Sequence, residues 1–145
     1  LDRMAELLRE WEISIALLHG GWSSVLALDA PPECEGWPIT ISEPEGGDEL
    51  RRFVLKNRAF SGSGLRKGPH ILDPRTGMPL KTMRAAWSSA STAARADALS
   101  TAFMVMSPEE IHAYCIAHPG TQGFLYDEPE DLFEYRHVQE FGSES

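Results

Sequence analysis

Two consecutive helix signals between residues 92 and 118 constrain the fold of this chain more than any other feature. The segment "TAARADALSTAFMVM" is rich in alanine and apolar at helical spacing, and Thr92 stands at its start as an N-cap. At "SPEE", Ser107 is a second N-cap, Pro108 occupies the first helical position and Glu110 completes a capping box. We expect this second helix to run to about His118, where "PGTQ" ends it.

Most of the remaining chain has strand character. The exception is the start of the chain, where we expect an amphipathic helix with Trp11 in the core. Apolar residues recur there at helical spacing: Leu1, Met4, Leu7, Leu8 and Trp11. Strands are predicted at 14–18, 25–28, 37–44, 50–56, 83–89, 123–127 and 133–141. The "EGGD" segment at 45–48 is interpreted as a turn, and "AFSGSGLRKG" at 59–68 as a flexible connection. Helices and antiparallel-type strands in separate places predict an α+β fold with mixed or antiparallel strands and packed helices.

Two details complete this prediction. Glycines after residue 18 suggest that the strands at 14–18 and 25–28 form a hairpin, and Pro38 places its strand at an edge because proline cannot donate to a ladder. A length of 145 residues is enough for one core and one domain.

Composition narrows the functional class. The formal net charge is −9, which disfavours a nucleic-acid partner because binding phosphates requires clustered Lys and Arg. Hydrophobic residues make up 42% and charged residues 24%, as in ordinary globular domains. The chain has 2 cysteines, Cys34 and Cys115, whose separation matches no metal-binding spacing.

The segment "HILDPRTG" at 70–77 combines a rigid turn with polar side chains. Pro74 fixes its own backbone and Gly77 can adopt a positive φ where the turn closes. His70, Asp73, Arg75 and Thr76 then stand in a row beside exposed backbone N–H groups, an array that can bind an anion. Taken alone, the same residues also fit a well-formed turn without a ligand.

A second polar pair lies on the alanine-rich helix. Asp97 and Thr101 are four residues apart and therefore share one helix face. Their oxygens are hard ligands that suit Mg²⁺ or Ca²⁺ better than zinc. A solvated Asp and a Thr bonded to its own helix remain the simpler interpretation of the pair in isolation.

The combination of motifs resembles the ApbE-like family, the FAD:protein FMN transferases. The similarity rests on "GPHILDPRTG", on "ADALSTAF" about twenty residues later, and on "RFVLKNRAFSGSG" and "LDRMAELLREWEISIALLHGG" further upstream. The four segments span nearly the whole chain in the family's order. It implies Mg²⁺-dependent transfer of FMN from FAD to a Thr or Ser hydroxyl of a target flavoprotein, with release of AMP. Asp97 and Thr101 match the family's metal ligands and His70 its essential histidine.

The resemblance also implies which other residues bind FAD. The Gly20-Gly21 turn and the turn residues Asp73, Arg75, Thr76 and Gly77 would line the cofactor. We expect His70 to accept the proton of the attacking hydroxyl, while phosphate binding by His70, shared with Arg75, is the alternative.

The sequence departs from the family pattern at two points. Trp22 stands where an Asn or Asp usually follows Gly-Gly, so a polar contact is lost or replaced by stacking on a ring of FAD. The family's domain is about twice this length, and we expect residues 1–145 to be its C-terminal half, with the N-terminal half missing. Two alternatives therefore stay open: a non-catalytic FAD-binding or scaffold protein, or a pyrophosphatase that converts FAD to FMN and AMP. Family habit suggests a bacterial protein on the outer side of the cytoplasmic membrane.

Overall fold

The computed structural model is built around an antiparallel sheet. It describes residues 1–43, 48–65, 68, 70–80, 84–127 and 138–142, so the expected turn at 45–48 lies largely outside them. The sheet has six strands in the order β1-β2-β5-β8-β9-β10, and every pairing in it is antiparallel. Their bounds are β1 Leu17–His19, β2 Ser24–Ala27, β5 Arg58–Gly64, β8 Arg84–Ala90, β9 Gln122–Asp127 and β10 Gln139–Phe141.

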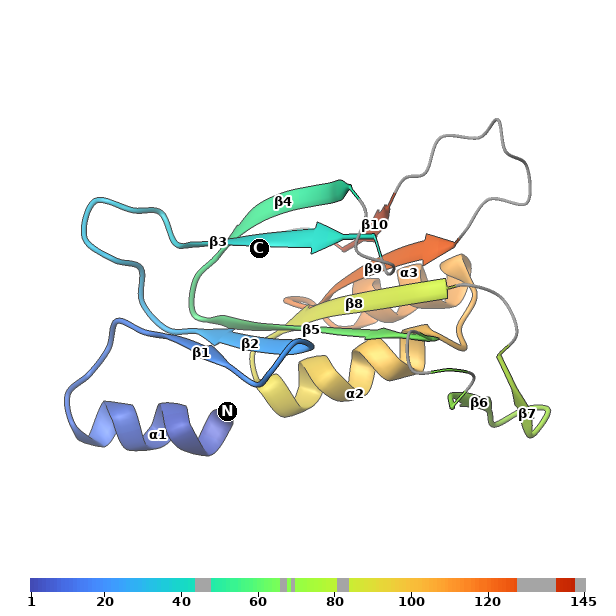
Figure 1. Ribbon diagram of the computed structural model, residues 1–145, viewed down its shortest axis with the longest axis horizontal. Helices are drawn as coiled ribbons and strands as arrows, with labels where there is room; N and C mark the ends of the chain where they lie inside the picture. The colour runs from blue at the N-terminus through green and yellow to red at the C-terminus, as the bar shows by residue number, and fades with distance from the viewer. Residues whose placement is uncertain (44–47, 66–67, 69, 81–83, 128–137, 143–145) are drawn as a thin grey trace.

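Three helices lie on one face of this sheet, and a two-stranded ribbon lies on the other (Figure 1). The helices are α1 Asp2–Glu10, α2 Ala93–Phe103 and α3 Pro108–Ala117. The ribbon pairs β3 Trp37–Ser42 with β4 Glu49–Leu55, and a small hairpin pairs β6 Leu72–Asp73 with β7 Met78–Pro79. This arrangement confirms the predicted α+β class. None of the helices in the described part of the chain is long and apolar enough to cross a membrane.

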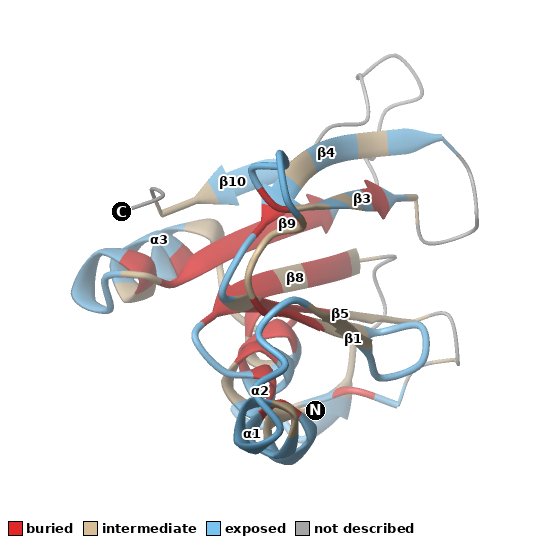
Figure 2. Ribbon diagram, turned by 90° about the vertical axis from the view of Figure 1, so that its left-hand side faces the viewer, coloured by how far each residue is buried: buried red, intermediate tan, exposed pale blue. Residues whose placement is uncertain are grey.

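Alternation along the strands builds the core on both faces of the sheet. On the helix face, Leu26 and Ala59 pack under α1 and α2, and Leu125 packs with α2 and α3. On the ribbon face, Phe60 and Phe124 pack under Phe53 of β4. Figure 2 shows that buried residues concentrate on β8, β9 and the side of α2 that faces the sheet.

The predicted helix starts are confirmed. The Thr92 side chain accepts a hydrogen bond from the Arg95 N–H, and Ser107 with Glu110 forms the capping box of α3. Asp2, on α1, adds a contact that the sequence did not suggest: its carboxylate accepts from the N–H groups of Ala93 and Ala94 at 2.8 and 2.9 Å. The negative charge of Asp2 lies at the positive N-terminal end of the α2 dipole and therefore stabilises the helix.

The interpretation of residues 59–68 as a flexible connection is wrong for its first half, because β5 runs through Arg58–Gly64 at the centre of the sheet. Gly and Ser suggested a loop, but here small residues serve close packing. A Cβ on Gly62 would overlap the indole of Trp87. The chain thus uses glycine to bring two neighbouring strands and an aromatic side chain together.

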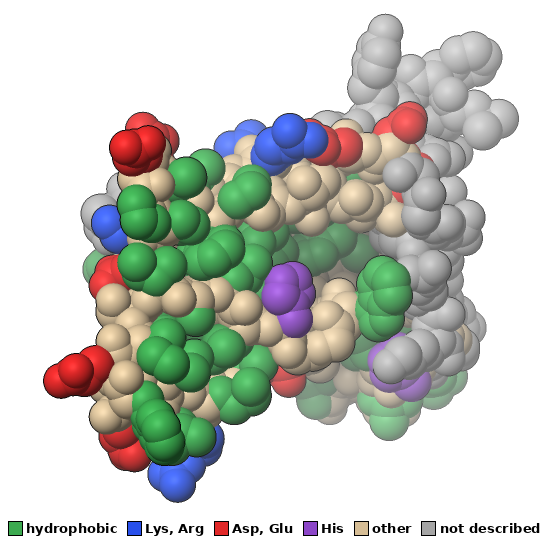
Figure 3. All heavy atoms as spheres, turned by 60° about the vertical axis from the view of Figure 1, so that its left-hand side comes forward, with side chains coloured by type: hydrophobic (Ala, Val, Ile, Leu, Met, Phe, Trp, Pro, Cys, Tyr) green, Lys and Arg blue, Asp and Glu red, His purple; other side chains and the backbone are tan. Residues whose placement is uncertain are grey.

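The prediction that Trp11 lies in the core is also wrong, because 74% of its surface is exposed. The apolar residues of α1 fall on two stripes, and only the one formed by Leu1, Ala5 and Leu8 contacts the sheet. Met4 and Leu7 lie with Trp11 on the exposed side. Hydrophobic side chains are accordingly numerous on this face of the molecule (Figure 3).

The packing of β9 against α2 and α3 can be tested at Gly123. A Cβ at this position would lie 2.8 Å from Ile111 Cγ2 and 3.0 Å from Phe103 Cε2. We expect Gly123→Ala to lower the free energy of unfolding by about 1–3 kcal/mol through overpacking, measured by urea denaturation. Gly64→Ala is the control, since its Cβ would meet Ala85 Cβ at an ordinary 3.6 Å. Equal stability of both variants would contradict this packing.

Candidate functional site

A pocket of about 1540 Å³ opens where the β1–β2 turn, β5 and α2 meet. It brings together five residues that the sequence nominated from three separate motifs: Gly20, Gly21, His70, Asp97 and Thr101. Trp22, the departure from the family pattern, also lines it. The pocket therefore joins segments that are up to about eighty residues apart in the chain.

Asp97 and Thr101 lie on the face of α2 that carries polar groups toward β5. Asp97 Oδ1 accepts a hydrogen bond from Ser61 Oγ at 3.0 Å. Thr101 Oγ1 lies 2.9 Å from Ser63 Oγ and donates to the Asp97 carbonyl at 3.3 Å. Asp97 and Thr101 are both exposed at the pocket, whereas Ser61 is fully buried.

These serines were not among the predicted site residues, because "FSGSG" was interpreted as a flexible segment. Their signal was present: Ser61 and Ser63 are two residues apart and so share one face of a strand. That face meets α2 only because β5 is central in the sheet.

The donor set of this pair is chemically suited to a hard cation. A carboxylate and a hydroxyl together provide the oxygen ligands that Mg²⁺ prefers, and Mg²⁺ usually completes its shell with water and substrate phosphates. Within the described residues there is no group of three or more His, Cys, Asp and Glu side chains that could hold a metal alone. A cation at this site would therefore need further oxygen ligands, supplied by a bound substrate, by water or by other parts of the protein.

His70 stands at the pocket with a defined ring orientation. Its Nδ1 lies 2.7 Å from the carbonyl oxygen of Gly68, and its backbone N–H donates to the same oxygen at 2.8 Å. A carbonyl can only accept, so the neutral imidazole carries its proton on Nδ1 and leaves the lone pair of Nε2 free. The side chain is exposed and can reach a ligand in the pocket.

The Gly20-Gly21 turn forms another wall. Gly21 has a φ of +74°, and the Gly20 N–H donates to the Ser24 carbonyl at 2.8 Å to close the turn. Glycine suits this left-handed conformation because it has no Cβ. The next residue, Trp22, projects entirely into solvent at the pocket.

An apolar wall completes the pocket on the ribbon side of the sheet. It is made by Val25, Ile39, Phe60 and Trp87, which come from β2, β3, β5 and β8. These residues alternate with the helix-facing ones and were not nominated from the sequence, because only the pairing of the strands brings them together.

The turn residues Asp73, Arg75, Thr76 and Gly77 do not line this pocket. The Asp73 carboxylate accepts from the backbone N–H and the Nε of Arg75 at 2.9 and 3.0 Å, and these bonds hold the pKa of Asp73 below its usual value. Thr76 Oγ1 accepts from the Met78 N–H at 3.2 Å, and Gly77 has a φ of +68°. Their assignment to FAD binding stays a prediction that this geometry does not support directly.

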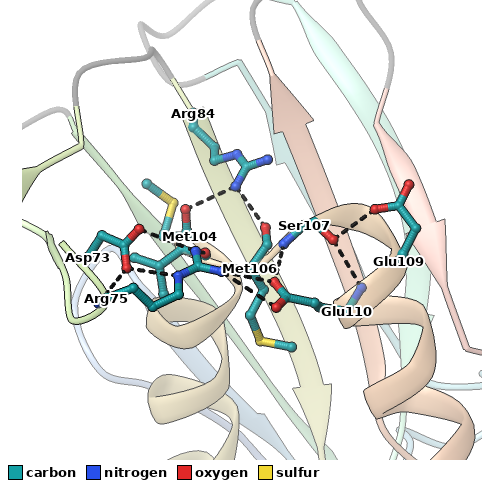
Figure 4. A network of polar contacts seen from close by, with 9 residues as sticks. Asp73, Arg75, Arg84, Met104, Met106, Ser107, Glu109 and Glu110 are labelled. Atoms are coloured by element: carbon teal, nitrogen blue, oxygen red, sulfur yellow. Dashed lines mark hydrogen bonds and ion pairs between the residues drawn. The ribbon is translucent and has the colours of Figure 1, made fainter.

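Arg75 instead reaches the segment that follows α2 (Figure 4). Its guanidinium donates to the Val105 carbonyl and forms an ion pair with Glu110 at 3.4 Å. Arg84 donates to the carbonyls of Met104 and Met106 at 3.1 and 2.9 Å in the same segment. Two arginines thus bind backbone carbonyls of the segment that links α2 to α3, next to the negative end of the α2 dipole.

Comparison with known proteins shows which proteins this chain resembles in sequence and fold. The model of the ApbE family matches residues 1–125. Three solved structures resemble the chain over 97% of its length: the apbe protein from Thermotoga maritima (25% identity, TM-score 0.78), flavinyl transferase ApbE from Pseudomonas stutzeri (22%, 0.74) and a mutant of Flavin Transferase ApbE from Vibrio cholerae (20%, 0.74). None of the curated proteins matches the sequence.

The chain spans less than half the length of these structures. It covers 47% of the Thermotoga and Pseudomonas chains and 43% of the Vibrio chain. The likeness to the Vibrio and Pseudomonas structures establishes the fold alone.

The contacts of Arg75 predict a structural effect for its removal. We expect Arg75→Ala to lower the urea midpoint, because the Val105 carbonyl loses this hydrogen bond and the Glu110 carboxylate loses its ion pair. The affinity for FAD should stay unchanged in a fluorescence titration. Arg52→Ala is the control, since among the described residues that exposed arginine forms an ion pair only with Glu49, three positions away. Weaker FAD binding at unchanged stability would instead support the assignment of Arg75 to the cofactor.

Proposed function

Because the chain belongs to the ApbE family, we propose that the protein transfers the FMN moiety of FAD to a Thr or Ser hydroxyl of a target flavoprotein and releases AMP, with Mg²⁺ as cofactor. The observation that carries the proposal is the meeting of His70, Asp97, Thr101 and the Gly20-Gly21 turn at one pocket. The solved structures named as flavin transferases support the same activity.

The reaction needs a base, a place for the phosphates and a site for the rings. In the transfer step the acceptor oxygen bonds to the phosphorus of the FMN phosphate, and the bond between that phosphorus and the oxygen of AMP breaks. The hydroxyl proton leaves as the new bond forms. Such phosphoryl chemistry relies mainly on positioning and on stabilising negative charge.

His70 is suited to accept the proton. With Nδ1–H bound to the Gly68 carbonyl, Nε2 is the free acceptor of the neutral ring. A base held in one tautomer and one orientation does not have to reorganise when the hydroxyl attacks. The exposed ring leaves room for the side chain of a second protein.

Asp97 and Thr101 would hold the Mg²⁺ through a carboxylate and a hydroxyl oxygen. When bound, the cation would neutralise charge on the phosphate oxygens of FAD. Both side chains are fixed by β5 serines at 2.9–3.0 Å, so their oxygens are held at defined positions in the pocket.

The apolar wall is suited to a planar ring system. Phe60 and Trp87 offer aromatic surface inside the pocket, and the exposed indole of Trp22 offers another at its edge. Aromatic faces of this kind stabilise flavin or adenine rings by stacking. The polar half of the pocket would then receive the pyrophosphate.

Mg²⁺-dependent release of AMP is the direct test of this function. The full-length protein is incubated with FAD, with and without Mg²⁺, and FAD binding and AMP are measured. We expect AMP only with Mg²⁺, and no Mg²⁺-dependent AMP from Asp97→Ala, a variant that keeps its helix because alanine is the better helix former. FAD binding without AMP would indicate a scaffold protein, and AMP without flavinylation of any hydroxyl would indicate a pyrophosphatase. Full activity in Asp97→Ala would contradict the metal assignment.

The role of His70 predicts a separation of binding from turnover. We expect His70→Ala to keep most of the affinity for FAD and to lower the rate of AMP release by about 10²–10⁴-fold, the usual contribution of a general base. His118→Ala is the matched control, because the Nδ1 of His118 also bonds a backbone carbonyl, that of Tyr114, away from the pocket. Unchanged turnover in His70→Ala would reduce His70 to a turn residue.

A further inference from the structure

The hydroxyl of Ser61 stands directly behind the carboxylate proposed to bind Mg²⁺. Ser61 lies in the middle of β5 and is fully buried, whereas Asp97 is exposed at the pocket. We infer that Ser61 is a positioning residue for the cation site, which sets the orientation of Asp97 without touching the cation itself. This inference rests on the proposed function of the pocket.

The single proton of the Ser61 hydroxyl has two acceptors within reach, the Asp97 carboxylate and the Ser23 carbonyl, and an ionised carboxylate is the stronger acceptor. Ser61 Oγ lies 3.0 Å from Asp97 Oδ1, 2.9 Å from Ser24 Oγ and 3.1 Å from the Ser23 carbonyl. A hydroxyl has one proton to donate, and an ionised carboxylate can only accept. When Ser61 donates to Asp97, Ser24 is free to donate to Ser61, so a chain of hydroxyls from β2 and β5 ends on the carboxylate.

This chain engages one oxygen of Asp97 and leaves the other for a ligand. Ser24 Oγ is also 3.4 Å from the same Oδ1, so two strands approach one atom of the carboxylate. Within the described residues no side chain bonds Oδ2. A carboxylate fixed through one oxygen presents the second at a defined angle, which is how outer-shell partners orient metal ligands.

The same strand orients the second proposed ligand. Ser63, two residues further along the face of β5, contacts Thr101 Oγ1 and Ser100 Oγ, each at 2.9 Å. Gly62 between the two serines faces the opposite side, where Trp87 occupies the space of a side chain. The "SGS" segment therefore holds both oxygen ligands on one face and the apolar wall on the other.

Ser61→Ala removes this support while keeping the ligand. The Asp97 side chain would then sample several rotamers, and ordering it when the cation binds would cost conformational entropy. Loss of an outer-shell partner typically weakens metal binding by about 10–100-fold. We expect the apparent Kd of Mn²⁺, used as a spectroscopic probe in place of Mg²⁺, to rise in this range in the full-length protein saturated with FAD, as measured by electron paramagnetic resonance.

Ser88→Ala is the matched control. Ser88 is equally buried, lies on the neighbouring strand β8, and donates to the Ala96 carbonyl of α2 at 2.6 Å. Both substitutions delete one buried hydroxyl between the sheet and α2, so both should lower the melting temperature. Only Ser61→Ala should weaken the binding of Mn²⁺. Ser61→Thr, which keeps the hydroxyl, should restore this binding.

The outcomes separate this inference from the proposed function. If wild-type protein with FAD binds no Mn²⁺, the cation site itself is refuted and Ser61 has nothing to position. If wild type binds Mn²⁺ and folded Ser61→Ala binds it equally well, the positioning role alone is overturned. Should Ser61→Ala fail to fold, Ser24→Ala decides: weaker Mn²⁺ binding supports the hydroxyl chain, and unchanged binding overturns it.

Discussion

Helix α2 rests on β5 and β8 through small side chains, and the placement of the site depends on this contact. Ala59, Ala86, Ala90 and Ala96 are completely buried in the layer between helix and sheet. Side chains of this size let the helix approach closely enough for a direct hydrogen bond from Ser88 to a helix carbonyl. A larger residue in this layer would lift α2 and separate its polar face from β5.

Polar groups hold both ends of α2, and the charged ones among them have the sign that suits the helix dipole. Asp2 and Thr92 accept hydrogen bonds from N–H groups in the first turn of α2. Arg75 and Arg84 donate hydrogen bonds to carbonyls that follow its last turn. These contacts come from α1, the β6–β7 hairpin and β8, so three distant segments fix one helix along its axis. Such restraint matters because a shift of α2 along the sheet would separate the β5 serines from Asp97 and Thr101.

The DPRTG turn illustrates how a motif acquires its role from its surroundings. From sequence alone, Asp73 and Arg75 were candidates for anion binding because they form part of a row of polar groups beside exposed backbone N–H groups. In the fold, Asp73 engages the guanidinium of Arg75 and aims it at the end of α2, while His70 faces the pocket. The spacing of residues in a turn does not reveal which of its sides meets the rest of the molecule.

The sequence by itself determined the helices α2 and α3 and nominated three polar residues of the pocket, His70, Asp97 and Thr101. Caps and periodicity specify α2 and α3 because these signals act within one turn of helix, and the i, i+4 spacing of Asp97 and Thr101 fixes their common face. Only the tertiary structure decided that "AFSGSG" is a central strand, that Trp11 lies at the surface, and that Ser61 stands behind Asp97. The physical reason is that strand pairing and helix docking depend on contacts between residues that are distant in the sequence, and local propensity contains no information about such contacts.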